Sequence, residues 1–176
     1  MSRYHRWPVA GWGLLLALCL SVLLACGYQL AGSGELPKGV NTIAVQVLAN
    51  HTAESGLETT ITNAVIDELT RRRQDLVVGV ERADGILSGT INRLTTSTSA
   101  RSDLLTAVER RLIVTVSFVL KDPSGKVLWQ GRQLSAEQAY AVGESKAATE
   151  MNRRLAIGIV AQRLAEYLFE RLTDSF

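Results

Sequence analysis

The sequence has 176 residues, with 19 Lys and Arg, 17 Asp and Glu, and a formal net charge of +2. Arg3 and Arg6 supply two of the basic residues and residues 1–25 contain no acidic one, so residues 26–176 carry 17 charges of each sign. The slight basic excess therefore belongs to the N-terminal segment and gives no support for a nucleic-acid partner.

Residues 1–25 are predicted to be an export signal. Arg3 and Arg6 precede an apolar run whose dense part, Leu14–Leu24, has signal-peptide length rather than the length of a comfortable membrane span. The motif Leu23-Leu24-Ala25-Cys26 resembles the bacterial lipoprotein signal, in which the cysteine becomes the acylated N-terminus. Leu24 is bulkier than the usual small residue, which predicts slow cleavage. A plain transmembrane anchor, or an ordinary secretory signal with an incidental Cys26, remains the alternative.

Cys26 is the predicted lipid anchor. Two or more acyl chains hold a protein stably on a membrane, whereas one chain binds only marginally. The residue after the cysteine is Gly27 rather than Asp. By resemblance to the bacterial lipoprotein sorting rule, this favours export to the outer membrane. Cleavage would also remove Cys19, so the mature chain would have no disulfide and would depend on its core alone.

Residues 26–41 are rich in Gly and are predicted to form a lipidated tether, followed by a single domain over residues 42–176. Ile43, Val45 and Val47 alternate with polar or small residues, which predicts a half-buried strand.

A helix is predicted to begin at Ser55, because Ser55-Gly56-Leu57-Glu58 has the spacing of a capping box. One face of this helix is apolar, and Arg71-Arg72-Arg73 closes it where cations suit the negative end of the dipole. The three arginines are either solvated charges or a patch for anionic lipid or phosphate. The apolar face consists of Leu57, Ile61, Ala64, Val65 and Leu69.

Three further strands are predicted over residues 85–98, 106–121 and 126–140. In the second of them one face is apolar and the other polar, which indicates a sheet with one buried and one wet side. Asp122-Pro123-Ser124-Gly125 is a hairpin signal. The expected buried face comprises Val108, Leu112, Val114, Val116, Phe118 and Leu120.

Residues 149–172 are predicted to form a long amphipathic helix. Its apolar stripe comprises Leu155, Ile157, Val160, Leu164, Leu168 and Leu172. The order β-α-β-β-β-α predicts an α+β two-layer sandwich, with a four-stranded mixed sheet and two helices packed on one face.

The residues predict a binding module rather than an enzyme. After Cys26 is committed to lipid, His51 is the only histidine or cysteine left in the mature chain, so a His/Cys metal cluster is excluded. No phosphate-binding or dinucleotide-binding glycine motif is present, and no cofactor is expected. A hydrolase built on His51 is the remaining enzymatic alternative.

An ordered series of short motifs resembles the LptE family of lipopolysaccharide-assembly lipoproteins. Together with the lipoprotein signal, the series spans nearly all of the mature chain. It comprises Cys26-Gly27-Tyr28-Gln29-Leu30, Leu36-Pro37, Gly39-Val40, Thr42-Ile43-Ala44-Val45, Gly56-Leu57-Glu58, Glu68-Leu69-Thr70-Arg71-Arg72, Gly89-Thr90 and Gly125-Lys126-Val127-Leu128-Trp129.

The resemblance implies a sheet with two helices packed on it. It also implies an outer-membrane lipoprotein that plugs the lumen of the LptD β-barrel translocon, aids the assembly of that barrel, and binds lipopolysaccharide on its way to the cell surface.

Lipopolysaccharide carries phosphates, which Arg and Lys recognise through charge-assisted hydrogen bonds. No motif assigns this role to one position, and each candidate is also explained as a solubilising cation. On physical grounds the candidates are Arg93, Arg101, Arg110, Arg111 and Lys121.

An alternative class of outer-membrane lipoprotein is suggested by residues 43–52. This strand, which runs into Asn50-His51-Thr52, resembles the opening of curli-secretion-type and penicillin-binding-activator lipoproteins. A ring-forming secretion subunit, or a periplasmic activator of an enzyme, is therefore the second expectation.

Overall fold

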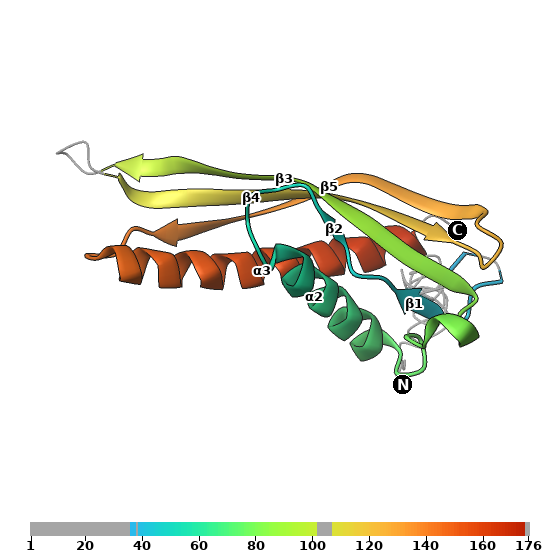
Figure 1. Cartoon of the computed structure of the whole chain (residues 1–176). Helices are drawn as coiled ribbons and strands as arrows, with labels where there is room; N and C mark the ends of the chain where they lie inside the picture. The colour runs from blue at the N-terminus through green and yellow to red at the C-terminus, as the bar shows by residue number, and fades with distance from the viewer. Residues whose placement is uncertain (1–35, 38, 102–106, 175–176) are drawn as a thin grey trace, which may run out of the picture. The chain divides into compact units, whose positions relative to one another are not determined.

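A computed structural model describes residues 36, 37, 39–101 and 107–174. The predicted signal and Cys26 lie outside the described residues. The elements are β1 (Ile43–Val45), β2 (Ala49–Asn50), α2 (Leu57–Arg72), the 3-10 helix η1 (Val80–Arg82), β3 (Gly85–Arg101), β4 (Ala107–Lys121), β5 (Val127–Ala141) and α3 (Lys146–Thr173) (Figure 1).

One mixed sheet runs in the order β1-β3-β4-β5, with β2 as a further short strand beside β3. β1 and β2 are parallel to β3, and the β3–β4 and β4–β5 pairs are antiparallel. The predicted α+β sandwich is therefore confirmed. The first predicted strand is wrong in detail, since β1 ends at Val45 and Val47 is 69% exposed.

The two faces of the sheet differ as the alternation in β4 predicts. Leu112, Val114, Val116, Phe118 and Leu120 are fully buried against the helices. The prediction for Val108 is wrong: this side chain is 43% exposed, because the helix layer covers that face of β4 only from Leu112 onward.

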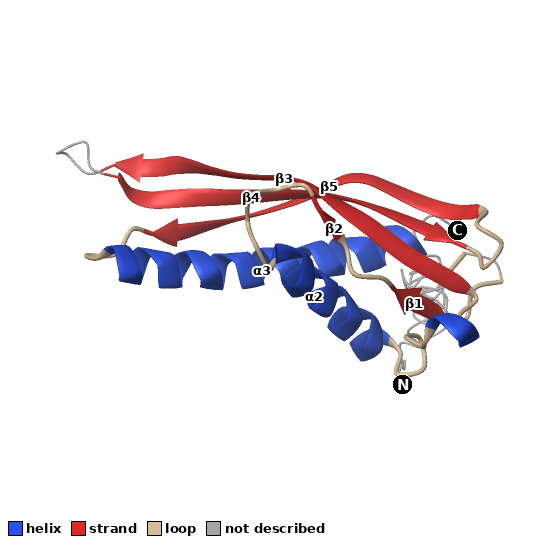
Figure 2. Cartoon of the chain, in the orientation of Figure 1, coloured by secondary structure: helices blue, strands red, loops and turns tan. Residues whose placement is uncertain are grey.

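α2 and α3 lie on the same side of the sheet, where α3 packs on β4 and β5 and α2 packs on α3, β1 and β2 (Figure 2). The predicted buried residues of α2 are buried or half-buried. The capping box is wrong, because Gly56 with φ +82° is the N-cap and no side chain caps the helix. The carboxylate of Glu58 accepts a hydrogen bond from Asn50 Nδ2 at 2.7 Å. The pKa of Glu58 lies below its usual value, chiefly because its own backbone N–H stabilises the carboxylate and also because of the bond from Asn50.

α3 begins at Lys146, three residues before the predicted start, and Ser145 caps it by accepting a hydrogen bond from the backbone N–H of Ala148 at 3.1 Å. Most of the predicted stripe is buried, but Leu155 is 61% exposed. The buried face of α3 includes three alanines instead, namely Ala156, Ala161 and Ala165. Small side chains there let α3 lie close to α2 and to the sheet.

The hydrophobic core also contains Leu36 and Val40, which precede the residue at which the domain is predicted to begin. Among the described residues, no helix combines the length and the apolar character that a membrane crossing requires.

Two polar contacts fix the connections around the sheet. Asp84, just before β3, accepts hydrogen bonds from the backbone N–H groups of Asn41 and Thr42 at 2.9 and 3.0 Å, and these bonds lower the pKa of Asp84. Arg153 of α3 donates to both carboxylate oxygens of Glu54 at 2.9 and 2.6 Å. This pair joins the loop before α2 to the second helix, and the hydrogen bond from Arg153 lowers the pKa of Glu54.

Candidate functional site

The outer face of the sheet, on the side away from the helices, is the strongest candidate surface. It is lined by side chains of odd-numbered residues of β4 and by their neighbours on β3 and β5. Hydroxyl and amide groups predominate around the middle of this face, in Asn92, Thr95, Ser97, Thr115, Ser117, Gln133 and Ser135.

Two β-bulges meet at Ser117 and widen this face. One lies in β3 between Ile91 and Arg93, and the other lies in β5 opposite the stretch from Val116 to Phe118. In the second bulge Gln133 has φ +53°, the one positive value found at a non-glycine residue in the described part of the chain. Such a conformation costs free energy and frequently occurs at binding sites.

The bulges enclose a shallow polar cup of about 440 Å³, lined by Asn92, Arg93, Thr115, Ser117, Gln133 and Ser135. Ser117 Oγ accepts a hydrogen bond from Asn92 Nδ2 at 2.8 Å and one from the Gln133 backbone N–H at 3.4 Å. The hydroxyls of Thr115 and Ser135 are 2.8 Å apart. Neutral donors and one guanidinium in a cup of this kind suit a sugar or a phosphate group.

The predicted basic residues do not form one cluster. Arg93 pairs in register with Thr115, whereas Arg111 lies four residues along β4, about 13 Å away. Lys121 lies about 33 Å from Arg111, at the other end of β4. Arg111 donates to Glu137 Oε1 at 3.1 Å, which offsets part of its charge.

Arg110 and Arg101 lie elsewhere. Arg110 is exposed on the helix side of β4, opposite Thr98 and Tyr140. Arg101 ends β3 and its backbone pairs with Ala107, and its side chain lies outside the described residues. Arg93 is therefore the predicted cation that the structure places in the polar cup.

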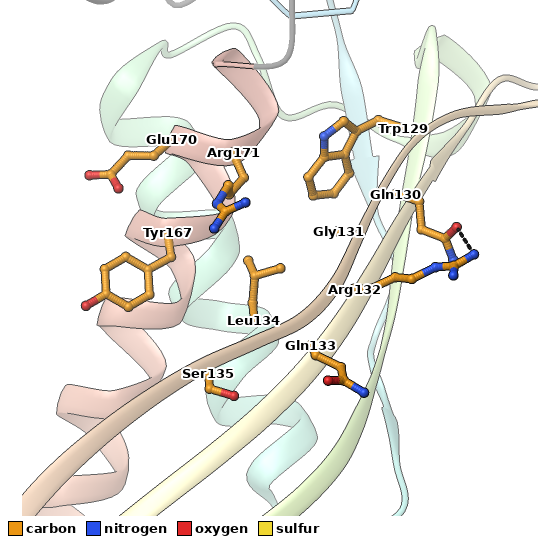
Figure 3. A pocket seen from close by; sticks show the side chains of 10 residues that line it. All are labelled: Trp129, Gln130, Gly131, Arg132, Gln133, Leu134, Ser135, Tyr167, Glu170 and Arg171. Carbon is orange, nitrogen blue, oxygen red and sulfur yellow. Dashed lines mark hydrogen bonds between the residues drawn. The ribbon is translucent and has the colours of Figure 1, made fainter.

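A second hollow of about 450 Å³ lies between β5 and the C-terminal half of α3 (Figure 3). Trp129, Gly131 and Leu134 come from β5, and Tyr167, Glu170 and Arg171 come from α3. Gln133 and Ser135 line both this hollow and the polar cup. The β5 bulge therefore borders both hollows.

The arginine run at the end of α2 has a structural role in this fold. Arg71 and Arg72 both pair with Glu68, whose side chain is almost fully buried, and Arg72 Nε lies 2.7 Å from Glu68 Oε1. The guanidinium of Arg72 also lies 4.9 Å from the centre of the Phe169 ring. Arg73 donates to the carbonyl of Asn41. These partners weigh against an anion-binding patch, and they make the run part of the packing between α2 and its neighbours rather than a row of simply solvated charges.

His51 is exposed after β2, and its backbone N–H donates to the carbonyl of Ile91 at 3.0 Å. Within the described ranges, no group of three His, Cys, Asp or Glu side chains is arranged to hold a metal ion.

Sequence reasoning missed Asn92 and Gln133. Neither residue belongs to a recognisable sequence motif, because each reaches the cup only through the register shift of its strand. A polar second half of β3 and the weak apolar alternation of β5 were the available signals.

The fold is a two-layer α+β domain whose outer sheet face carries a polar cup. A family model described as "LptE: Lipopolysaccharide-assembly" matches residues 40–172. The chain therefore belongs to the LptE family, and it is a lipopolysaccharide-assembly lipoprotein. The family is not enzymatic.

Solved structures share the fold at low sequence identity. Rare lipoprotein B from Shewanella oneidensis is 16% identical with a TM-score of 0.55, covering 75% of this chain and 95% of that one. Lipoprotein B from Nitrosomonas europaea is 10% identical with a TM-score of 0.52, covering 75% and 82%. PelC from Paraburkholderia phytofirmans, a dodecamer, is 19% identical with a TM-score of 0.50, covering 81% and 96%. No curated protein sequence matches the chain.

Proposed function

We propose that this protein is an outer-membrane lipoprotein that plugs an LptD-type β-barrel, helps that barrel to assemble, and binds lipopolysaccharide during transport. The single observation that carries the proposal is the LptE family match over residues 40–172. Acylation at Cys26 would hold the protein on the periplasmic side of the outer membrane.

The surface of the domain supports the role of a plug. A protein that fills a hydrated barrel needs polar groups where it meets the wall, and the outer face of the sheet presents hydroxyls and amides. The balance of 17 basic and 17 acidic residues after residue 25 avoids strong repulsion from a wall of either sign.

The polar cup supports lipopolysaccharide binding. Phosphorylated sugars present anionic oxygens and hydroxyls, and Arg93 with Thr115 and Ser135 supplies matching donors and acceptors within one cup. Arg111 on the same face is the second contact that we propose. Arg110 lies on the opposite face of the sheet, and Arg101 and Lys121 lie at the ends of β3 and β4. These three residues remain candidates for other parts of the ligand.

The partner role is tested by affinity purification of the full lipoprotein from detergent-solubilised outer membrane. The proposal expects a stoichiometric large β-barrel protein, and depletion of the lipoprotein should raise sensitivity to large hydrophobic antibiotics. Homo-oligomeric rings or a murein synthase in place of the barrel would support the alternative lipoprotein classes instead.

The ligand role is tested with purified lipopolysaccharide and the full chain in detergent. Arg93→Ala should weaken binding about tenfold or more, because a hydrogen bond to a charged group contributes roughly 1.5–3 kcal/mol. Arg82→Ala, at an exposed arginine of η1, is the matched control and should bind as the unchanged protein does. Equal loss in both variants would refute a role for the cup.

A further inference from the structure

The edge of β3 beyond β2 has no neighbouring strand in the part of the chain that the structure describes. β1 pairs with Gly85–Leu87 and β2 pairs with Thr90 and Ile91, while β3 continues to Arg101. Figure 1 shows this part of β3 running on past β2 with β4 on one side only. The backbone on the other side is therefore open.

The open edge is regular enough to act as a template. From Arg93 to Thr98, successive residues of β3 pair without interruption with Thr115 to Arg110 of β4. The carbonyls of Leu87 and Ile91 accept hydrogen bonds from Gln46 and His51 on the β1 and β2 side. Along a strand, the backbone N–H and C=O groups of successive residues point alternately to one neighbouring strand and to the other. After the bulge at Asn92, the register directs the backbone groups of the even-numbered β3 residues away from β4 and toward the open side. The N–H and C=O groups of Leu94, Thr96 and Thr98 consequently point outward.

Apart from the charge of Arg93, this stretch has few of the usual protections of an edge strand. It contains no Pro, no Lys and no bulge between Arg93 and Thr98. Its side chains are exposed except for the half-buried Leu94. The other end of the sheet differs, because β5 is interrupted by its bulge at Gln133 and flanked by α3. The β3 edge is therefore the better site for an added strand.

The arginines near the β3 edge indicate the charge of the strand that would be added there. Arg93 and Arg110 are exposed and have no ion-pair partner among the described residues, and Arg111 is only partly offset by Glu137. A second copy of this chain would bring the same cations into the joint sheet, which is unfavourable. An acidic strand would be attracted to them.

We propose that the β3 edge from Arg93 to Thr98 is a docking site for an extended acidic segment of another protein, which adds as a strand to the sheet. Backbone hydrogen bonds to Leu94, Thr96 and Thr98 hold the segment, and its carboxylates on the outer face lie beside Arg93. Arg111 on the outer face and Arg110 on the helix side lie one strand further, on β4, and add to the attraction. Arg93 and Arg111 are also the lipopolysaccharide contacts proposed above, but docking depends on the outward backbone groups of β3. Hydrogen exchange at these amides therefore tests the site separately from lipopolysaccharide affinity.

The test uses the full chain in detergent and a short synthetic peptide that alternates Glu with Thr and Val. Hydrogen exchange is measured at single amides, with and without about 1 mM peptide, a concentration that detects even weak binding. The amides of Leu94, Thr96 and Thr98 should exchange fast in the free protein and about tenfold more slowly with the peptide. The same peptide with Lys in place of Glu should give no protection.

Thr96→Pro removes one outward N–H without removing a bond of the β3–β4 ladder, and it should abolish the protection. Thr96→Ala keeps the N–H and is the matched control. Thr98→Pro tests the same row of donors in case Thr96→Pro does not fold. Slow exchange of the three amides in the free protein, equal protection by the Lys peptide, or no protection by the Glu peptide would overturn the proposal. Protection that depends only on protein concentration would indicate a second copy instead and would also overturn it.

Discussion

Thr62→Val should destabilise the domain by about 1–3 kcal/mol. The Thr62 hydroxyl is buried, accepts a hydrogen bond from the backbone N–H of Leu48 at 3.1 Å, and donates to the carbonyl of Glu58 at 2.6 Å. Valine has nearly the same shape but cannot accept the bond, so the Leu48 N–H loses this partner. An unsatisfied buried donor costs about 1–3 kcal/mol. The hydrogen bond from Leu48 links the loop between β1 and β2 to α2.

The assay is equilibrium unfolding in urea, with Thr60→Val as the matched control. Thr60 lies in the same helix, but it is exposed and its hydroxyl donates only to the carbonyl of Gly56 in the preceding turn. The control should stay within about 0.5 kcal/mol of the unchanged protein. Equal stability of the two variants would refute the reasoning, because it would mean that Leu48 finds another acceptor at no cost.

Three further predictions concern other contacts. Glu54→Gln should lower the free energy of unfolding at pH 7, and the difference from the unchanged protein should shrink as the pH falls below about 4.5. The reason is that Arg153 lowers the pKa of Glu54, so the stabilisation is complete above the unfolded-state pKa and is lost as Glu54 becomes protonated. Urea midpoints at several pH values check this, and a difference that stays constant down to pH 3 would contradict it. Gly131→Ala should cost about 1–3 kcal/mol, since the added methyl would overlap the Trp129 ring and lie 3.0 Å from Leu134 Cδ1. Trp129 is the only tryptophan after residue 25, so its fluorescence should shift as well, and an unchanged spectrum would show that the ring need not move. Arg111→Ala should weaken lipopolysaccharide binding less than Arg93→Ala, because Arg111 is paired with Glu137, and side-by-side titrations compare the two variants.

The parts of the fold that depend on apolar periodicity were predictable. The alternation in β4 and the stripe of α2 place most of their buried residues correctly, because burial of apolar area decides which face turns inward. The errors lie at element ends. The Ser55 cap failed because the chain turns through Gly56. Leu155 is exposed because it lies about 200° around the helix from the buried Ile157.

The candidate site was predictable in residue type but not in position. Basic residues on the strands were an obvious choice for phosphates, yet only the register shows that Arg93 and Arg111 share a face and that Arg110 points to the other side. The shift at Asn92 changes the face of the β3 residues from Arg93 to Thr98, where the next register shift follows. In β3 the buried Ile91 and the half-buried Leu94 are three residues apart, which breaks the period of two. That spacing alone does not say how the neighbouring strands pair, so the sequence could not locate the cup.

The composition of the cup also bears on how tightly a ligand would be held. Arg93 is the only charged side chain that lines it, and the other lining residues are neutral donors and acceptors. A neutral hydrogen bond contributes about 0.5–1.5 kcal/mol, roughly half of what a charged one contributes. Two cations converging on one phosphate would bind it more tightly and release it more slowly. A carrier that must pass its ligand on needs the weaker arrangement, so placing a second arginine in the cup, as in Ser135→Arg, should increase lipopolysaccharide affinity and slow its release. Dissociation rates of the variant and of the unchanged protein decide this, and faster release from the variant would contradict binding in the cup.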